Sequence, residues 1–98
     1  MKSSKFPEKY QDETEKATNL LKKEGCEAVF LFGSMVTGKT HQDSDIDIGI
    51  MGLPPKQFFR VHADLDKQLT VNVDLVDFDL YKDLYILLDS LGEVVRLG

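Results

Sequence analysis

The segment from Asp45 to Met51 constrains the fold more than any other part of this 98-residue chain. Isoleucines alternate there with Asp45, Asp47 and Gly49. Because the side chains of a β-strand point alternately to opposite faces, this pattern places the isoleucines on one face and both carboxylates on the other. The segment is therefore predicted to be a strand with one apolar face and one acidic face.

The rest of the chain predicts a sheet flanked by helices. The wholly apolar run at 28–32 is typical of a strand buried on both faces. The fold class expected is α/β (α+β), a small mixed β-sheet in the order α-β-(short turn)-β-α-β-α. The expected elements are a helix from about Pro7 to Gly25, a strand at 28–32, one helical turn at 34–38, the strand at 45–51, a helix after Pro54 and Pro55, a strand at 71–77, a helix from its N-cap Asp79 to about Ser90, and a short edge strand at 93–97.

Size and composition exclude several classes of protein. A chain of 98 residues can bury one modest core, so we expect one domain over 1–98 without a separate substrate domain. A net charge of −5 argues against broad binding of nucleic acid. The sequence has no apolar run long enough to span a membrane and no apolar leader, and Cys26 is its single cysteine. We therefore expect a cytoplasmic protein without an internal disulfide, and two histidines with one cysteine make a structural zinc site improbable.

Residues Gly33 to Thr40, GSMVTGKT, match the P-loop pattern G-x-x-x-x-G-K-[ST] literally. A P-loop needs a helix that begins at Lys39 and Thr40, because the N–H groups at the start of that helix bind the phosphates. The residues that follow, HQDSDIDIGIMG, show no apolar spacing of 3.6 residues. A P-loop-type NTPase is therefore the third hypothesis for the function.

A second pattern begins at the same glycine. Gly33-Ser34 is followed after ten residues by Asp45 and Asp47, and Asp74 lies on the next predicted strand. Two carboxylates about 4 Å apart repel by about 4 kcal/mol at an effective dielectric constant of about 20. A cluster of three therefore raises pKa values or needs a cation, and hard oxygen ligands suit Mg²⁺. Two such ions can hold the attacking and leaving oxygens of a phosphoryl displacement.

The residues before the carboxylates suit a phosphate tail. Gly33 lets the backbone approach a phosphate closely, and Ser34 offers a hydroxyl and a backbone N–H. Lys39 is either a solvated loop lysine or a phosphate ligand. Ser44 serves either in a turn or in a hydrogen bond to a metal-binding carboxylate.

The order Gly-Ser, variable stretch, Asp-x-Asp and later carboxylate resembles the nucleotidyltransferase superfamily with the DNA polymerase β-like fold. The stretch GSMVTGKTHQDSDIDIGI looks most like its minimal nucleotidyltransferase (MNT) group, and the resemblance covers about residues 28–77. It implies transfer of a nucleoside monophosphate from an NTP, with ATP expected, to an acceptor hydroxyl with release of pyrophosphate. It also implies that Asp45, Asp47 and Asp74 hold two Mg²⁺ ions and that Asp74 helps to deprotonate the acceptor.

The resemblance also implies a partner. MNT proteins are often paired with a helical HEPN protein in toxin–antitoxin systems, and in some pairs the MNT protein is the antitoxin and adenylylates the toxin. Many MNT proteins carry an arginine where this chain has Met35-Val36-Thr37, and Lys39 could take over its contact with phosphate. This departure supports a second hypothesis, a catalytically weak or inactive module that binds and neutralises a partner.

Other polar residues near these motifs have structural interpretations. We expect loop positions for His41 and Asp43, turn or cap positions for Asp77 and Asp79, a half-buried core position for His62 and a core position for Cys26.

Overall fold

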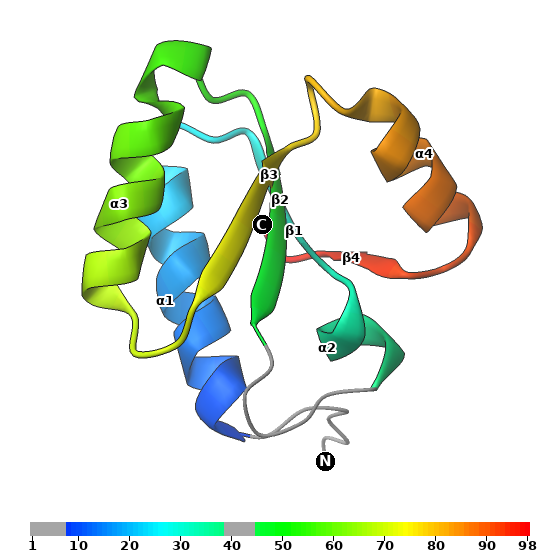
Figure 1. The fold of residues 1–98 in the computed structure, drawn as a ribbon, viewed down its shortest axis with the longest axis horizontal. Coiled ribbons are helices and arrows are strands. Elements are labelled where there is room, and N and C mark those ends of the chain that lie inside the picture. The colour runs from blue at the N-terminus through cyan, green and yellow to red at the C-terminus, as the bar shows by residue number, and fades with distance from the viewer. Residues whose placement is uncertain (1–7, 39–44) are drawn as a thin grey trace.

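The computed structural model describes residues 8–38 and 45–98 and confirms the expected fold class (Figure 1). A four-stranded mixed sheet has the strand order β3-β2-β1-β4. Strand β1 pairs antiparallel with both β2 and β4, while β2 and β3 are parallel. The elements are α1 (Glu8–Lys23), β1 (Ala28–Phe32), α2 (Ser34–Thr37), β2 (Ile46–Met51), the 3-10 turn η1 (Pro55–Gln57), α3 (Phe58–Gln68), β3 (Val73–Asp77), α4 (Lys82–Ser90) and β4 (Val94–Arg96).

Helices cover the two faces of the sheet unequally. Helices α1 and α3 lie side by side on one face, and α4 lies on the other (Figure 1). The isoleucines of β2 are fully buried beneath α1 and α3, as their alternation predicts. The short helix α2 follows β1 directly at the end of the sheet where β2 begins. No helix within the described ranges is long and apolar enough to cross a lipid bilayer.

The second face is packed by an aromatic cluster under α4. The ring of Phe78 is fully buried and lies 5.3–5.7 Å, between centroids, from the rings of Phe30, Phe32 and Tyr85. Phe78 also lies against Gly49, where an added β-carbon would collide with the ring. The glycine in β2 is thus required because an aromatic ring occupies the space of its side chain.

The start of the last helix differs from the expectation. Asp79 is not its N-cap, because α4 begins at Lys82 after Tyr81 and residues 78–80 form a turn. The carboxylate of Asp79 instead accepts a hydrogen bond from the N–H of Gly52 at 2.7 Å. The third strand also starts later than expected, at Val73 rather than residue 71.

A buried carboxylate ties α1 to the loop before β3. Glu13 Oε1 accepts hydrogen bonds from the backbone N–H and the hydroxyl of Thr70. Its other oxygen lies 3.4 Å from the ammonium of Lys16. Burial raises the pKa of Glu13, but the hydrogen bonds from Thr70 and Lys16 outweigh it, so the net pKa is below its usual value. The loop that leads into Asp74 is therefore held by a charged acceptor.

Replacing Glu13 with Gln should destabilise the fold by about 1 kcal/mol at pH 7, because a charge-assisted acceptor becomes a neutral one. A carboxyl group with a lowered folded-state pKa stabilises the fold above its unfolded-state pKa of 4.5, and that stability is lost as pH falls. Urea unfolding of the two proteins should therefore differ at pH 7, and the difference should shrink as the pH falls below 4.5. Glu15→Gln, on the exposed side of the same helix, is the control, and a Glu13→Gln effect that did not shrink with acidification would contradict this account.

Candidate functional site

Two carboxylates meet near one end of the sheet. Asp47 of β2 is the register partner of Asp74 on the parallel strand β3. Neighbouring strands lie about 4.8 Å apart and paired residues point to the same face, so the two carboxylates are adjacent. Asp47 is half-buried and Asp74 is exposed. Asp45 is exposed and immediately precedes β2. The period-two prediction that Asp47 faces away from the buried isoleucines is therefore correct.

The environment of Asp47 disfavours its charge. Burial, followed by the charges of Asp74 and Asp45, raises the pKa of Asp47 to about 6. Three carboxyl groups therefore influence one another across this end of the sheet. A divalent cation would relieve both the repulsion and the desolvation, since carboxylate oxygens are the ligands that Mg²⁺ prefers.

These three residues are not a closed metal cage. Within residues 8–38 and 45–98, no three side chains of His, Cys, Asp or Glu gather closely enough to hold an ion as they stand. The structure provides an adjacent pair, Asp47 and Asp74, and an electrostatic influence from Asp45. The donor chemistry fits a hard cation, and the joint ligand set of Asp45, Asp47 and Asp74 stays a prediction.

Gly33 makes room for the carboxylate of Asp47. Its φ of 77° and ψ of −146° lie in a region that is essentially restricted to glycine. A β-carbon at this position would collide with Oδ2 of Asp47 and lie 3.0 Å from its Cγ. The conformation of Gly33 and the close approach of Asp47 thus both require glycine at the first position of the motif.

The segment between the two glycines forms a helical turn, as predicted. The carbonyl of Gly33 accepts hydrogen bonds from the N–H groups of Val36 and Thr37, and α2 begins at Ser34. Gly38 ends α2 in the left-handed conformation, and its N–H bonds to the carbonyl of Ser34. This arrangement does not support the P-loop hypothesis, which needs an open loop here and a helix that begins at Lys39. The antiparallel pairing of β1 with β2 also differs from the parallel crossover of a βαβ unit.

His62 has a partner that the sequence analysis did not identify. Its Nε2 lies 2.9 Å from the carbonyl oxygen of Val73, so the ring N–H donates to the residue just before Asp74. The histidine is half-buried on α3, as expected. Its spacing from Phe58 and Leu65 indicated a helix face toward the core, but only the tertiary arrangement places the ring against the start of β3. His62 and Glu13 therefore both hold the segment that carries Asp74.

Other candidates fall outside the site. Lys39 and Ser44, proposed to bind nucleotide, and His41 and Asp43 lie outside the described residues. Asp77 accepts a hydrogen bond from the N–H of Asp79 at 2.9 Å, in agreement with a turn function. Cys26 is buried as predicted, and burial raises the pKa of its thiol to about 11. Such a thiol stays protonated at neutral pH and is a poor nucleophile.

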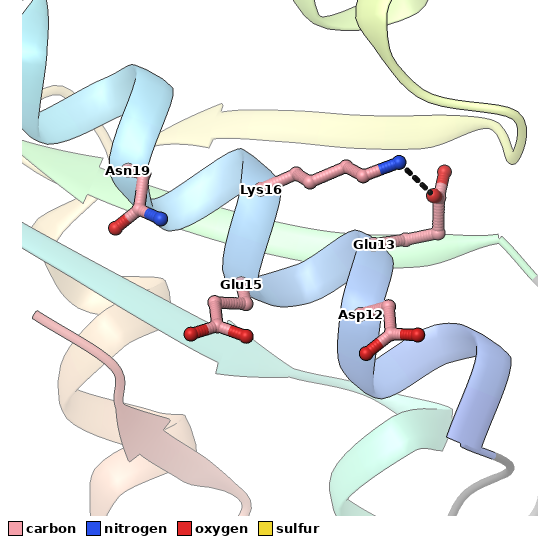
Figure 2. A pocket seen from close by; sticks show the side chains of 5 residues that line it. All are labelled: Asp12, Glu13, Glu15, Lys16 and Asn19. Carbon is pink, nitrogen blue, oxygen red and sulfur yellow. Dashed lines mark hydrogen bonds and ion pairs between the residues drawn. The ribbon is translucent and has the colours of Figure 1, made fainter.

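A shallow depression along α1 is a separate feature (Figure 2). It is lined by Asp12, Glu13, Glu15, Lys16 and Asn19, all on one helix. Asp12 and Glu15 point to one side in Figure 2, while Lys16 pairs with Glu13 on the other. Helix α1 covers the isoleucine face of the sheet and Asp47 lies on the other face, so the depression is a solvated helix surface rather than part of the carboxylate site.

A family model described as polymerase beta, nucleotidyltransferase, matches residues 15–93. The chain belongs to this nucleotidyltransferase family. The match begins within α1 and ends just before β4, so it includes β1, β2 and β3 with both Asp47 and Asp74. No curated protein sequence matches this nucleotidyltransferase chain significantly.

Solved structures give the same fold. One, described as a toxin–antitoxin with AMP-PNP, is 26% identical with a TM-score of 0.70 and covers 86% of this chain and 71% of its own. A second, the toxin–antitoxin MntA-HpeT with a tyrosine replaced by alanine, is 26% identical with a TM-score of 0.68. Its alignment covers 87% of this chain and 71% of the MntA-HpeT chain. A third, MntA-HpeT with two aspartates replaced by glutamate, is 28% identical with a TM-score of 0.56. Its alignment covers 66% of this chain and 56% of the MntA-HpeT chain. The nucleotidyltransferase described here is therefore similar to chains of toxin–antitoxin complexes.

Replacing Gly33 with Ala should destabilise this nucleotidyltransferase by at least about 2 kcal/mol, because the backbone conformation is strained for any other residue and the β-carbon meets Asp47. In the Gly33→Ala variant, the further change Asp47→Ala should restore part of the lost free energy of unfolding, because it removes the carboxylate that collides with the new β-carbon. A double-mutant cycle measured by urea unfolding should show a coupling of about 1 kcal/mol. Strictly additive losses would mean that Gly33 and Asp47 do not touch.

Asp47→Asn should stabilise the metal-free protein at pH 7.5 by about 1 kcal/mol, a value reduced to allow for solvent screening of this partly exposed group. The sign follows from the raised folded-state pKa, because the ionised form is less favourable in the folded protein than in the unfolded chain. The gain should be complete above pH 6 and vanish below about pH 4, as both states become protonated. Thermal unfolding without divalent metal across this range tests it, with exposed Asp66→Asn as the control, and a lower stability of Asp47→Asn at pH 7.5 would contradict it.

Proposed function

We propose that this chain is a Mg²⁺-dependent nucleotidyltransferase that moves a nucleoside monophosphate from an NTP, with ATP expected, to a hydroxyl of a partner protein. The observation that carries the proposal is the pairing of Asp47 with Asp74 beside a glycine whose missing side chain leaves room for Asp47. A domain that only bound a partner would have no need for adjacent carboxylates that raise the free energy of the folded state.

In this proposal Asp45, Asp47 and Asp74 hold the metal ions. The bound metal would neutralise phosphate charge and orient the leaving pyrophosphate. The acceptor hydroxyl oxygen forms a bond to the α-phosphorus, and the bond from that phosphorus to the bridging oxygen of pyrophosphate breaks. The hydroxyl proton passes to Asp74, which is the more exposed member of the paired carboxylates.

The nucleotide would lie between the carboxylates and the short helix α2. Gly33 keeps the backbone close to Asp47, and Ser34 is partly exposed at the start of α2 with its hydroxyl available to a phosphate. Lys39 and Ser44 remain in the proposal as the cation and hydroxyl that reach the same phosphates. The structural neighbour described with AMP-PNP supports a nucleoside triphosphate as the donor.

The acceptor and partner would be a helical HEPN-type toxin, with this chain as its antitoxin. The support is that the neighbours at TM-scores of 0.70 and 0.68 belong to toxin–antitoxin complexes. A third neighbour carries two aspartate-to-glutamate changes two positions apart, the spacing of Asp45 and Asp47. The buried, unpaired Cys26 suits the reducing cytoplasm that we propose as the location.

Incubation with α-³²P-labelled NTPs, Mg²⁺ and lysate of the source cells tests the proposal. The wild-type chain should label a macromolecule, and Asp45→Asn with Asp47→Asn should reduce labelling by at least about 100-fold. Chelation of Mg²⁺ should have the same effect. Asp66→Asn, an exposed change on α3, should leave labelling unchanged.

A lack of labelling would support the alternative function, a module that binds a partner without transferring a nucleotide. If no nucleotide labels any macromolecule in lysate that contains the partner, the chain is a binding module and not a transferase. The missing arginine at Met35-Val36-Thr37 is the feature that favours this alternative. Labelling that survives the double aspartate change would exclude the carboxylates as the catalytic groups.

A further inference from the structure

Strand β3 forms the outer edge of the sheet, and β2 is its only neighbouring strand within the described residues. At the start of their ladder, the N–H of Ile46 donates to the carbonyl of Asn72 at 3.0 Å. The C=O groups of successive residues in a strand point to opposite sides, so the carbonyl of Val73 points away from β2. An unpaired backbone group is costly, and this carbonyl therefore needs a donor from outside the sheet.

The side chain of His62 supplies this donor. Its Nε2 lies 2.9 Å from the carbonyl oxygen of Val73, and a carbonyl only accepts, so Nε2 carries the proton. Helix α3 runs alongside β3 (Figure 1). The ring of Phe58, one helical turn earlier, meets the histidine ring edge-on with 6.1 Å between centroids. The imidazole is therefore held between its own helix and the open edge of β3.

Helix α3 is itself fixed by contacts with other elements. Val61 and Leu65 are fully buried in the core that α3 shares with α1. Arg60 donates a hydrogen bond at 2.9 Å to Glu24, which lies just after α1. These contacts tie the helix that carries His62 to elements other than β3. A hydrogen bond from this helix can therefore hold the start of β3 in place.

We infer that His62 positions Asp74 for the proposed transfer reaction, because its hydrogen bond keeps the start of β3 against β2. The inference deepens the proposed function and rests on it for the consequence in metal binding. Asp47 lies on a strand that is paired on both sides, whereas Asp74 lies on the outer strand, next to Val73. Like charges on the two carboxylates push the outer strand away from its neighbour. The hydrogen bond from His62 opposes this displacement at the adjacent residue.

His62 acts through the backbone and does not meet the nucleotide. Helix α3 covers the isoleucine face of the sheet, whereas Asp47 and Asp74 belong to the opposite face. The histidine is therefore a positioning residue and not a catalytic one. Glu13 holds Thr70 by a separate contact further from Asp74, so the hydrogen bond from His62 acts closest to the carboxylate pair.

Binding of Mn²⁺ measures whether the position of Asp74 depends on His62. The free ion is followed by electron paramagnetic resonance in the full chain at pH 7.5, with a non-hydrolysable ATP analogue present. His62→Ala should weaken this binding about fivefold, the factor that corresponds to one hydrogen bond, because the metal must then draw the outer strand into place unaided. His62→Gln places an amide N–H at the distance of Nε2, and should bind Mn²⁺ within about twofold of wild type.

Ala17→Gly is the matched control for stability. Ala17 is fully buried inside α1, and glycine in a helix should lower the free energy of unfolding about as much as the loss of one hydrogen bond. This variant should leave Mn²⁺ binding unchanged. Thermal melts followed by circular dichroism show that each variant is folded and how far it is destabilised. A histidine that only stabilised the fold would give the same Mn²⁺ result as Ala17→Gly.

Spectra of the metal-free protein by nuclear magnetic resonance separate this inference from the transferase proposal. Both His62 variants lack the imidazole ring, so the difference between them reports the hydrogen bond. The N–H of Ile46 should resonate further upfield in His62→Ala than in His62→Gln, because its hydrogen bond to Asn72 lengthens. The N–H of Phe78, which donates to Ile50 at the far end of the ladder, should keep the same position in both variants.

Unchanged Mn²⁺ binding in His62→Ala would overturn the inference. Equal losses of binding in His62→Ala and His62→Gln, or a matching loss in Ala17→Gly, would also overturn it. If the wild-type chain binds no Mn²⁺ with the nucleotide, the proposed function fails instead. The metal-free comparison then decides the inference alone: the upfield shift of Ile46 supports it, and an identical position in the two variants overturns it.

Discussion

The register of β2 between its two neighbours is the constraint on which the site depends. Strand β2 pairs antiparallel with β1 and parallel with β3, and its residue 47 faces Phe32 on one side and Asp74 on the other. A slip of one residue would turn Asp47 into the core and bring an isoleucine to the surface. The three buried isoleucines prevent that slip, so the packing of one face fixes the position of the carboxylate on the other.

Two glycines complete the arrangement around Asp47 in different ways. Gly33 follows β1 and leaves space for the carboxylate itself, in a backbone conformation that other residues rarely adopt. Gly49 stands two residues along β2 on the same face and leaves space for the ring of Phe78. The ring of Phe78 can therefore pack close to the sheet, and the aromatic cluster extends as far as Phe32, the cross-strand partner of Asp47. The acidic end remains partly open to solvent while the rest of this face is covered.

Alternating hydrophobicity predicted much of this fold because strand and helix periods depend on local geometry alone. The faces of Asp47 and Asp74 followed from that alternation, but their pairing did not, because a period of two says nothing about which strand lies alongside. The contacts of His62 with Val73 and of Glu13 with Thr70 join elements distant in sequence and leave no local pattern. Asp79 was expected to cap α4 because its residue type suits an N-cap. Residues 78–80 instead form a turn, in which the carboxylate of Asp79 accepts a hydrogen bond from the N–H of Gly52.

Binding of Mn²⁺, a paramagnetic substitute for Mg²⁺, tests most directly whether Asp47 and Asp74 form a metal site for nucleotide. The free ion can be measured by electron paramagnetic resonance at pH 7.5 with a non-hydrolysable ATP analogue present. We expect the wild-type chain to bind Mn²⁺ with the nucleotide, and Asp47→Asn and Asp74→Asn each to weaken this binding at least tenfold. Equal binding by wild type and both variants would contradict the central claim.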